Sequence, residues 1–301
     1  MIDWLGALPG AMAQGLIWGI MAIGVYITYK ILDIADLTVD GTLCTGAAVC
    51  TMLIIAGWNP WLAMLCAFAA GLLAGLVTGL FHTLLGIPAI LAGILTQMIL
   101  WSVNLKILGK ANQAISARNY TVLLSQMDIP AALLLLLVFS LLTIALLYLF
   151  FGTELGCSIR ATGCNPSMSR AQGINTNYTK VLGLALSNGI VALAGALLCQ
   201  YQGYTDVNMG RGAVVIGLAA VVIGTAVVKR ISPNFAVKLS GVLIGAVIYY
   251  IVYQSIIFLG FDTDLLKMFS AVVVAIFLGI PYLKKKASAS RIAAKGGKTH
   301  A

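Results

Sequence analysis

The chain carries no Asp, Glu, Lys or Arg between Asp40 and Lys106. Other charge-free runs cover 129–153, 181–205, 212–228, 239–261 and 268–283. A helix needs about 20 apolar residues to cross the ~30 Å hydrocarbon core of a bilayer. These runs are apolar throughout, whereas barrel strands alternate between apolar and polar residues. The pattern therefore predicts an all-α polytopic membrane protein.

The composition agrees with this fold class. Hydrophobic residues make up 61% of the 301 residues and charged residues only 9%, whereas a soluble chain carries about 25% charged residues. No stretch remains for a soluble domain of useful size. We therefore expect one membrane domain over residues 1–285, followed by a basic cytoplasmic tail over 286–301.

Nine transmembrane helices are predicted, and eight or ten also fit because the second and the seventh are short. The predicted spans lie near 11–30, 42–57, 61–80, 88–107, 131–151, 180–200, 211–228, 236–258 and 266–283. The first span has neither a basic flank nor a small-residue cleavage site before it, so we expect a retained anchor rather than a signal peptide.

The distribution of Lys and Arg predicts the orientation. With the N-terminus outside and the C-terminus in the cytoplasm, 13 of the 18 basic residues are cytoplasmic. The residues that oppose this rule include Lys106, at the outer end of the fourth predicted span, and Lys110 and Arg118 in the predicted external segment 109–130. The bias depends strongly on the residues after the last span, because these supply six of the 13: Lys284, Lys285, Lys286, Arg291, Lys295 and Lys298.

Several kinds of chemistry have no support in the sequence. The six cysteines form no CxxC pair, and the two histidines, His82 and His300, lie far apart, so we expect neither disulfides nor a metal site. There is no Walker A or Rossmann motif. The net charge of +9 comes from residues that flank spans and contact anionic lipid, so nucleic acid is not an expected partner. His82 is expected to be a hydrogen-bonding residue at a span end.

A polar island interrupts the apolar runs at 152–180, where the sequence reads GTELGCSIRATGCNPSMSRAQGINTNYTK. Asn165 can cap a short helix, Pro166 suits its first turn, and Gly173 can end it. A short helix held between two spans on the cytoplasmic side can serve as a binding surface for another protein. This pattern favours a membrane protein driven by a partner.

Polar residues within the predicted spans are candidates for a translocation pathway. The segment Leu32–Thr42 (LDIADLTVDGT) has two interpretations: a cytoplasmic loop in which Asp40 and Gly41 turn and cap the next helix, or the lining of a central pathway. Intramembrane polar groups need partners or water. The pathway candidates are Thr38, Asp40, Thr42, Thr45, Thr96, Gln97, Asn104 and Asn188.

Small residues also recur with helical spacing. Gly71, Gly75 and Gly79 lie on one face of a predicted helix, and Gly241 and Gly245 form a second pair. Small residues at this spacing let two helix backbones approach closely. We interpret both sets as packing surfaces.

The polar island also carries a family resemblance. The run from Gly156 to Ile174, with Arg160-Ala161-Thr162-Gly163, Asn165-Pro166 and Arg170-Ala171, resembles the cytoplasmic coupling segment of ABC importer permeases of the branched-chain amino acid and ribose type. LDIADLTVDGT, HTLLGIPAILAGILT, SVNLKILGKAN and DTDLLKMFSAVVVA resemble the permease subgroup that pairs with TrpX-like binding proteins, a tryptophan/tyrosine transport system. The resemblance covers about residues 15–285.

The resemblance implies a type II-like ABC importer permease fold in a bacterial plasma membrane. It implies a homodimer around a central pathway and two cytoplasmic ABC ATPases that use ATP and Mg. An external substrate-binding lipoprotein would deliver the solute, and this chain would hold no cofactor and perform no catalysis. The residues implied for ATPase coupling are Gly156, Arg160, Ala161, Gly163, Asn165, Pro166, Arg170, Ala171, Gly173 and Ile174. Those expected for docking of the lipoprotein are Asp206, Arg211, Asp262, Asp264 and Lys267.

Other functions stay open at the level of sequence. An ATP-independent carrier or channel is the main alternative, although an ion-coupled carrier usually keeps an acid or a base near mid-membrane and the predicted spans contain none at that depth. A scaffold, an enzyme subunit or an exporter permease are further alternatives. The substrate is equally open: an aromatic amino acid follows from the family label, and other amino acids, nucleosides or a small cofactor fit as well.

Overall fold

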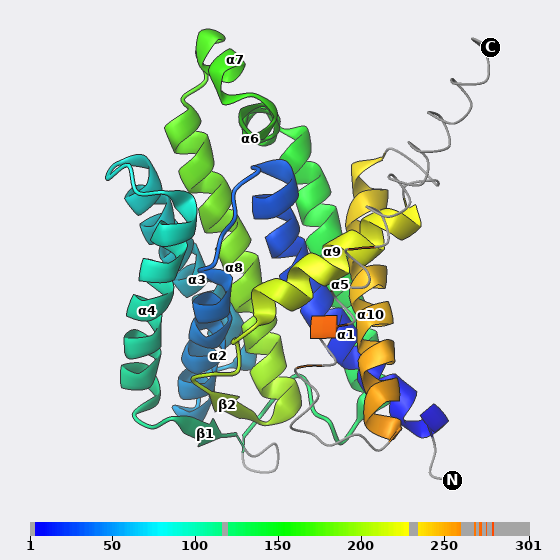
Figure 1. Cartoon of the computed structure of the whole chain (residues 1–301). Coiled ribbons are helices and arrows are strands. Elements are labelled where there is room, and N and C mark those ends of the chain that lie inside the picture. The colour runs from blue at the N-terminus through cyan, green and yellow to red at the C-terminus, as the bar shows by residue number, and fades with distance from the viewer. Residues whose placement is uncertain are drawn as a thin grey trace, which may run out of the picture.

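The computed structural model describes residues 4–115, 120–228 and 234–259 and the positions 268, 271, 272, 275 and 279. Within these residues the fold is a bundle of helices with one small sheet (Figure 1). The helices are α1 (Trp4–Tyr26), η1 (Ile27–Ile31, a π-helical turn), α2 (Val39–Ile55), α3 (Pro60–Thr83), α4 (Ala89–Leu108), α5 (Ile129–Gly152), α6 (Glu154–Cys164), α7 (Pro166–Ala171), α8 (Thr176–Gln202), α9 (Ala213–Val228) and α10 (Phe235–Phe258).

The predicted all-α membrane fold is confirmed, but the count of nine spans is not. In the described part of the chain six segments are long and apolar enough to cross a membrane: Gly6–Ile31, Pro60–Thr83, Ala89–Leu108, Ile129–Gly152, Thr176–Gln202 and Phe235–Phe258. The second and seventh predicted spans are the short helices α2 and α9, with 17 and 16 residues. The ninth span and the basic tail fall outside the described residues, apart from isolated positions, so both stay predictions.

The two ends of the bundle carry different structures. Helices α6 and α7 form one end, here called the α7 end (Figure 1). The opposite end carries strands β1 (Asn112–Ala114) and β2 (Tyr204–Asp206), which pair antiparallel with Gln113 opposite Thr205. This second end, here called the sheet end, also holds the start of α1. The predicted arrangement, with residue 4 and the coupling segment at opposite ends, matches this layout.

Helices α1 and α8 form the centre of the bundle. Their spans are 78% and 72% buried, against 28% for α4 and for α5. The short helix α2 packs against α3, α4 and α8. Because α2 is shielded on these sides by neighbouring helices, its polar side chains must find partners inside the protein.

The segment 33–38 is inserted into the bundle instead of forming a loop at its end. After η1 the chain turns at Asp33, which has a positive φ of 56°, and runs back between the helices. The side chain of Asp36 is 6% exposed and that of Thr38 is fully buried. The interpretation as a cytoplasmic loop that caps the next helix is therefore wrong. Thr38 holds the N-cap position of α2, so Asp40 and Gly41 lie within the helix and do not cap it.

The glycine sets pack helices together, as predicted. Gly71, Gly75 and Gly79 of α3 face the backbone of α8, and a Cβ at Gly75 would lie 2.7 Å from the Cα of Ala185. Gly241 and Gly245 of α10 meet Ala220 and Gly224 of α9 in the same way. Without side chains at these positions the helix backbones come into direct contact.

Replacing Gly75 by alanine should destabilise the α3–α8 contact. The added methyl group overlaps the backbone of α8, which lies inside a packed bundle and has little room to shift. Overpacking of this kind costs about 1–3 kcal/mol. We expect a lower unfolding temperature for Gly75→Ala in detergent, measured by tryptophan fluorescence.

Gly152→Ala is the matched control, because a Cβ at Gly152 meets no atom within 4 Å. This variant should unfold at the wild-type temperature. Equal unfolding temperatures for the two variants would contradict the packing role of Gly75.

Candidate functional site

A buried hydrogen-bond network joins the inserted segment to α3 and α8. The Asn188 amide nitrogen on α8 donates to Asp36 Oδ2 at 2.7 Å, and Thr42 Oγ1 on α2 donates to Asn188 Oδ1 at 2.7 Å. Asp36 Oδ1 accepts from the backbone N–H of Thr38 at 2.8 Å. The hydroxyls of Thr38 and of Thr78 on α3 share a hydrogen bond of 2.8 Å. The network thereby fixes the point at which α2 begins.

Three of the predicted pathway residues belong to this network. Thr38, Thr42 and Asn188 are completely buried, and their polar groups bond to one another and to Asp36. Asp36 itself is an acid buried within the bundle, where the predicted spans place none. Its two carboxylate oxygens both accept hydrogen bonds, as a buried carboxylate requires.

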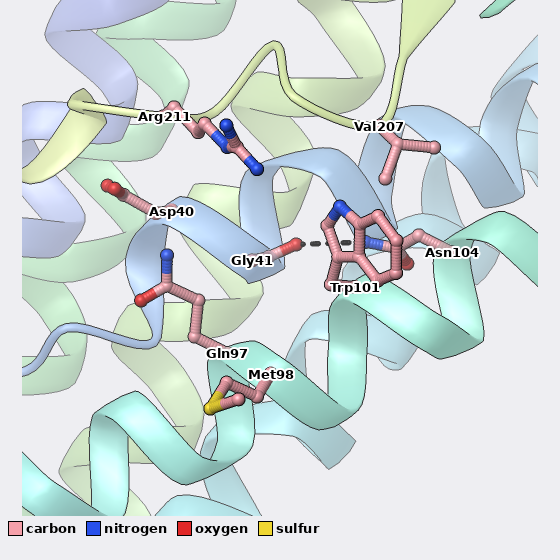
Figure 2. Close-up of a pocket in the computed structure, with 8 residues that line it drawn as sticks. All are labelled: Asp40, Gly41, Gln97, Met98, Trp101, Asn104, Val207 and Arg211. Carbon is pink, nitrogen blue, oxygen red and sulfur yellow. Dashed lines mark hydrogen bonds between the residues drawn. The ribbon is translucent and has the colours of Figure 1, made fainter. Parts of the chain in front are cut away.

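A cleft of about 240 Å³ opens at the surface between α2, α4 and the segment before α9 (Figure 2). Its walls come from the first turn of α2, the second half of α4 and residues 207 and 211. Three predicted pathway residues line it, together with one predicted docking residue. The lining residues are Asp40, Gly41, Gln97, Met98, Trp101, Asn104, Val207 and Arg211.

Asp40 connects α2 to the start of α9. Its carboxylate accepts the backbone N–H of Gly212 and that of Val214, each at 3.0 Å. A carboxylate is favoured at this position because the first N–H groups of a helix are unpaired and carry a partial positive charge. Next to it, Gly210 N–H donates to Cys44 Sγ at 3.1 Å, and a Cβ at Gly210 would overlap the Asp40 carbonyl. The first turns of α2 therefore hold the start of α9 in place.

Two polar groups of the cleft lack a partner within the described residues. Asn104 Nδ2 donates to Gly41 O at 3.3 Å, but its Oδ1 is buried without a hydrogen bond. Arg211 is exposed at the rim, and no ion pair to it occurs in the described part of the chain. In Figure 2 its guanidinium group projects between Asp40 and Trp101. Arg211 is therefore open to a ligand or to water, whereas Asn104 Oδ1 is an unsatisfied acceptor in the buried wall of the cleft.

Sequence reasoning missed the apolar part of this lining. Met98, Trp101 and Val207 were not predicted because only polar side chains within the spans indicate a pathway. A usable pattern was present: Gln97, Trp101 and Asn104 are spaced i, i+4 and i+7, which places them on one face of α4.

The remaining predicted pathway and docking residues lie elsewhere. The hydroxyls of Thr45 and Thr96 donate to the backbone carbonyls of Gly41 and Ala92 in their own helices, at 3.0 Å each. Asp206 lies in β2 and its carboxylate accepts the N–H of Asn208. Asp262, Asp264 and Lys267 fall outside the described residues.

Residues suited to metal or redox chemistry are scattered. Within the described ranges no three His, Cys, Asp or Glu side chains come together as a metal site, and the six cysteines are free thiols. The prediction for His82 is confirmed: its Nδ1 lies 2.9 Å from Ile87 O at the end of α3, and its Nε2 lies 3.4 Å from Lys180 Nζ.

The segment between α5 and α8 forms two helices. The predicted helix is α7: Asn165 Oδ1 accepts the N–H of Met168 at 3.0 Å, Pro166 is its first residue, and Gly173 follows its end with a φ of 84°. Helix α6 was not predicted. It is capped by Thr153, whose hydroxyl accepts the N–H of Gly156 at 3.3 Å.

Helix α6 is anchored to the bundle, whereas α7 protrudes from it (Figure 1). The Arg160 guanidinium lies 5.5 Å from the centre of the Phe235 ring, and its Nη1 donates to Phe151 O at 3.4 Å. Arg170 Nε donates to Thr176 Oγ1 at 3.0 Å, which ties α7 to the first residue of α8. On α7 the side chain of Met168 is 58% exposed. Ala161 and Ile174 are half-buried, Gly163 packs against the carbonyl of Ile31, and Ala171 is exposed.

Helices long enough to span a membrane, a polar cleft and a protruding helical segment are features expected of a transport permease. Residues 8–280 match the family described as "Branched-chain amino acid transport system / permease component". The chain belongs to this family. It is therefore a permease of the ATP-binding-cassette transporter class and not itself an enzyme.

Individual relatives agree with this assignment. The chain is 38% identical over 274 residues, 91% of each chain, to a tyrosine transport system permease protein of Clostridioides difficile. It is 34% identical over 276 residues to a protein of Rickettsia prowazekii, covering 91% of this chain and 97% of the other. A solved structure, PsaBC from Streptococcus pneumoniae in complex with Fab, shares the fold with a TM-score of 0.52 at 15% identity, covering 95% of this chain and 96% of that one.

Replacing Asn188 by leucine should destabilise the whole bundle. The variant leaves Asp36 Oδ2 buried without its donor, whereas the Thr42 hydroxyl keeps the carbonyl of Thr38 as acceptor. An unpaired buried polar group costs about 1–3 kcal/mol, more when it is charged. We expect a clearly lower unfolding temperature in detergent. Asn177→Leu is the control, since Asn177 is an exposed residue of the same helix. If the two leucine variants were equally stable, the network would not hold α2 in place.

Proposed function

We propose that the chain is the translocation subunit of an importer and works as a homodimer. In this arrangement the cleft of each copy faces the other across a water-filled pathway. The observation that carries the proposal is the position of the cleft: it exposes polar and charged groups beside the middle of a membrane-spanning helix.

The cleft is poorly suited to contact with lipid. Gln97 lies near the middle of Ala89–Leu108, and Arg211 is exposed on the same cleft. Moving an arginine to the centre of a lipid-facing helix costs about 2.5–3.5 kcal/mol on insertion scales. Polar groups at this depth normally face a bundle interior or an aqueous cavity. A second copy placed over this face would satisfy that requirement.

The charges favour a cytoplasmic location for the α7 end. Lys30, Arg160, Arg170, Lys180 and Lys238 all flank helices at this end. Towards the sheet end the described basic residues are Lys106, Lys110 and, in the cleft after β2, Arg211. Basic residues near spans concentrate on the cytoplasmic side. The sheet end would then face outward and receive the substrate-binding lipoprotein, with Asp206 as one docking residue.

Helix α7 would transmit the motion of the ATPases. Its start is capped by Asn165 and its end is tied to α8 through Arg170, so it can move together with the bundle. Met168 presents an apolar side chain at its surface, which is suited to a pocket on a partner. Two ATPase subunits with ATP and Mg would close and open against this helix in each copy. The guanidinium of Arg160 already contacts its own chain and would support α6 instead of the partner.

An aromatic amino acid is the proposed solute, because the relative from Clostridioides difficile is named as a tyrosine transport permease. An ATP-independent carrier is the second candidate, and the buried Asp36 is the acid that such a carrier would need. The hydrogen bonds to both carboxylate oxygens favour a structural role for Asp36. The ABC permease family assignment also favours the importer.

Uptake into proteoliposomes tests the importer. The chain is reconstituted with the ATPase and the lipoprotein that co-purify with it, and accumulation of L-[³H]tyrosine is followed. We expect accumulation that requires both partners and ATP on the α7 side. Uptake by the chain alone, without ATP, would favour the carrier or a channel.

Met168→Glu should separate the chain from its ATPase. A carboxylate in an apolar docking pocket opposes binding, and we expect at least about a tenfold loss of recovered ATPase, equivalent to ~1.4 kcal/mol. Met127→Glu is the matched control, because Met127 is also exposed but lies at the sheet end, before α5. Full recovery of the ATPase with Met168→Glu would exclude Met168 from the contact.

A further inference from the structure

We infer that the cleft is a selectivity site that recognises the two charged ends of a free amino acid. The inference rests on the proposed function and deepens it. It assigns part of the substrate selection to the permease itself, in addition to any selection made by the external binding protein. Arg211 would bind the α-carboxylate, and Asn104 would bind the α-ammonium group.

Arg211 is the group in the cleft that suits an anion. It is exposed and has no ion-pair partner in the ranges that the structure describes. The start of α9, which would otherwise attract an anion, is already occupied because Asp40 accepts the N–H groups of Gly212 and Val214. The guanidinium fork matches the two oxygens of a carboxylate. A carboxylate entering the cleft would therefore bind at Arg211.

Asn104 is the group that suits a cation or another donor. Its Oδ1 is a buried acceptor without a hydrogen bond, which is a costly state for an amide. Its Nδ2 is engaged with Gly41 O, so the amide cannot simply turn to exchange its two atoms without losing that bond. The carboxylate of Asp40 lies on the same cleft and adds negative charge. An ammonium group would satisfy Asn104 Oδ1 and be attracted by Asp40.

The remaining wall of the cleft suits an apolar or aromatic side chain. Trp101 and Met98 project from α4 with 45% and 67% of their surfaces exposed. Figure 2 shows the indole ring of Trp101 beside Asn104. The volume of about 240 Å³ lies below the ~300–1,000 Å³ of drug-sized sites, so the cleft suits a small solute. A site for a cation, a site for an anion and an aromatic wall together suit a ligand that carries both charges and an apolar side chain.

Equilibrium binding to the purified full-length chain tests this inference without ATPase or lipoprotein. The probe is L-phenylalanine, compared with phenethylamine, which lacks the carboxylate, and 3-phenylpropionate, which lacks the ammonium group. Dissociation constants come from ligand-observed saturation-transfer NMR in detergent. We expect L-phenylalanine to bind at least about tenfold more tightly than either analogue, because each analogue loses one charge-assisted interaction.

Two substitutions should remove one preference each. With Arg211→Gln, L-phenylalanine should lose its advantage over phenethylamine and keep it over 3-phenylpropionate. With Asn104→Leu, L-phenylalanine should lose its advantage over 3-phenylpropionate and keep it over phenethylamine. Gly41 O retains its hydrogen bond from Thr45 Oγ1 in the second variant, so no new unpaired group arises there. Lys238→Gln and Asn177→Leu make comparable chemical changes at exposed sites away from the cleft and should behave as the wild type.

Absence of L-phenylalanine binding to the wild-type chain would overturn the inference. The inference would also be overturned if both cleft variants weakened the binding of all three ligands equally. In that case neither residue would interact selectively with one charged end of the ligand. The exposed position of Arg211 keeps the test available even if Asn104→Leu does not fold. ATP-driven uptake together with a negative binding result would leave the importer intact and remove only the selectivity site.

Discussion

The hydrogen bond between Asn188 and Asp36 determines where the second helix begins, and much of the functional architecture depends on that position. An acidic segment would be expected to stay at the end of the bundle in water. Here Asn188 from α8 and the N–H of Thr38 donate to the Asp36 carboxylate inside the protein, and the hydroxyl of Thr42 donates to Asn188. Because the carboxylate is satisfied, the chain can run back between the helices before α2 starts.

The position of α2 then fixes the position of α9 and the shape of the cleft. Asp40 lies in the first turn of α2 and accepts the first free N–H groups of α9. A longer α2 that started at the end of the bundle would place this carboxylate elsewhere. The segment before α9 thus lines the same cleft as the second half of α4, and Arg211, Gln97 and Asn104 share that cleft. The short helices α2 and α9 and the polar cleft beside them therefore all follow from the insertion of segment 33–38 into the bundle.

The sequence was sufficient for features that depend on local chemistry. Charge-free runs located the helices, Asn165 and Pro166 located α7, and Gly75 with its neighbours located a packing face. It was insufficient where a polar residue is satisfied by a distant partner. Asp36 and Asp40 suggested a loop because their partners, Asn188 and the start of α9, lie more than a hundred residues away in the chain. The apolar residue Trp101 was missed because nothing in its local sequence distinguishes a cleft wall from a lipid-facing surface.

In the proposed pathway the cleft faces water and not lipid, and thiol labelling distinguishes these two environments. Gln97→Cys and Leu141→Cys are made in a background where the accessible Cys66, Cys157 and Cys164 are serine, and the complex is reconstituted in vesicles. Leu141 is an exposed apolar residue in the middle of α5. A membrane-impermeant methanethiosulfonate, applied from both sides with and without ATP, should label Gln97→Cys and leave Leu141→Cys unmodified. Protection of Gln97→Cys in every state, to the level of Leu141→Cys, would contradict an aqueous pathway at this cleft.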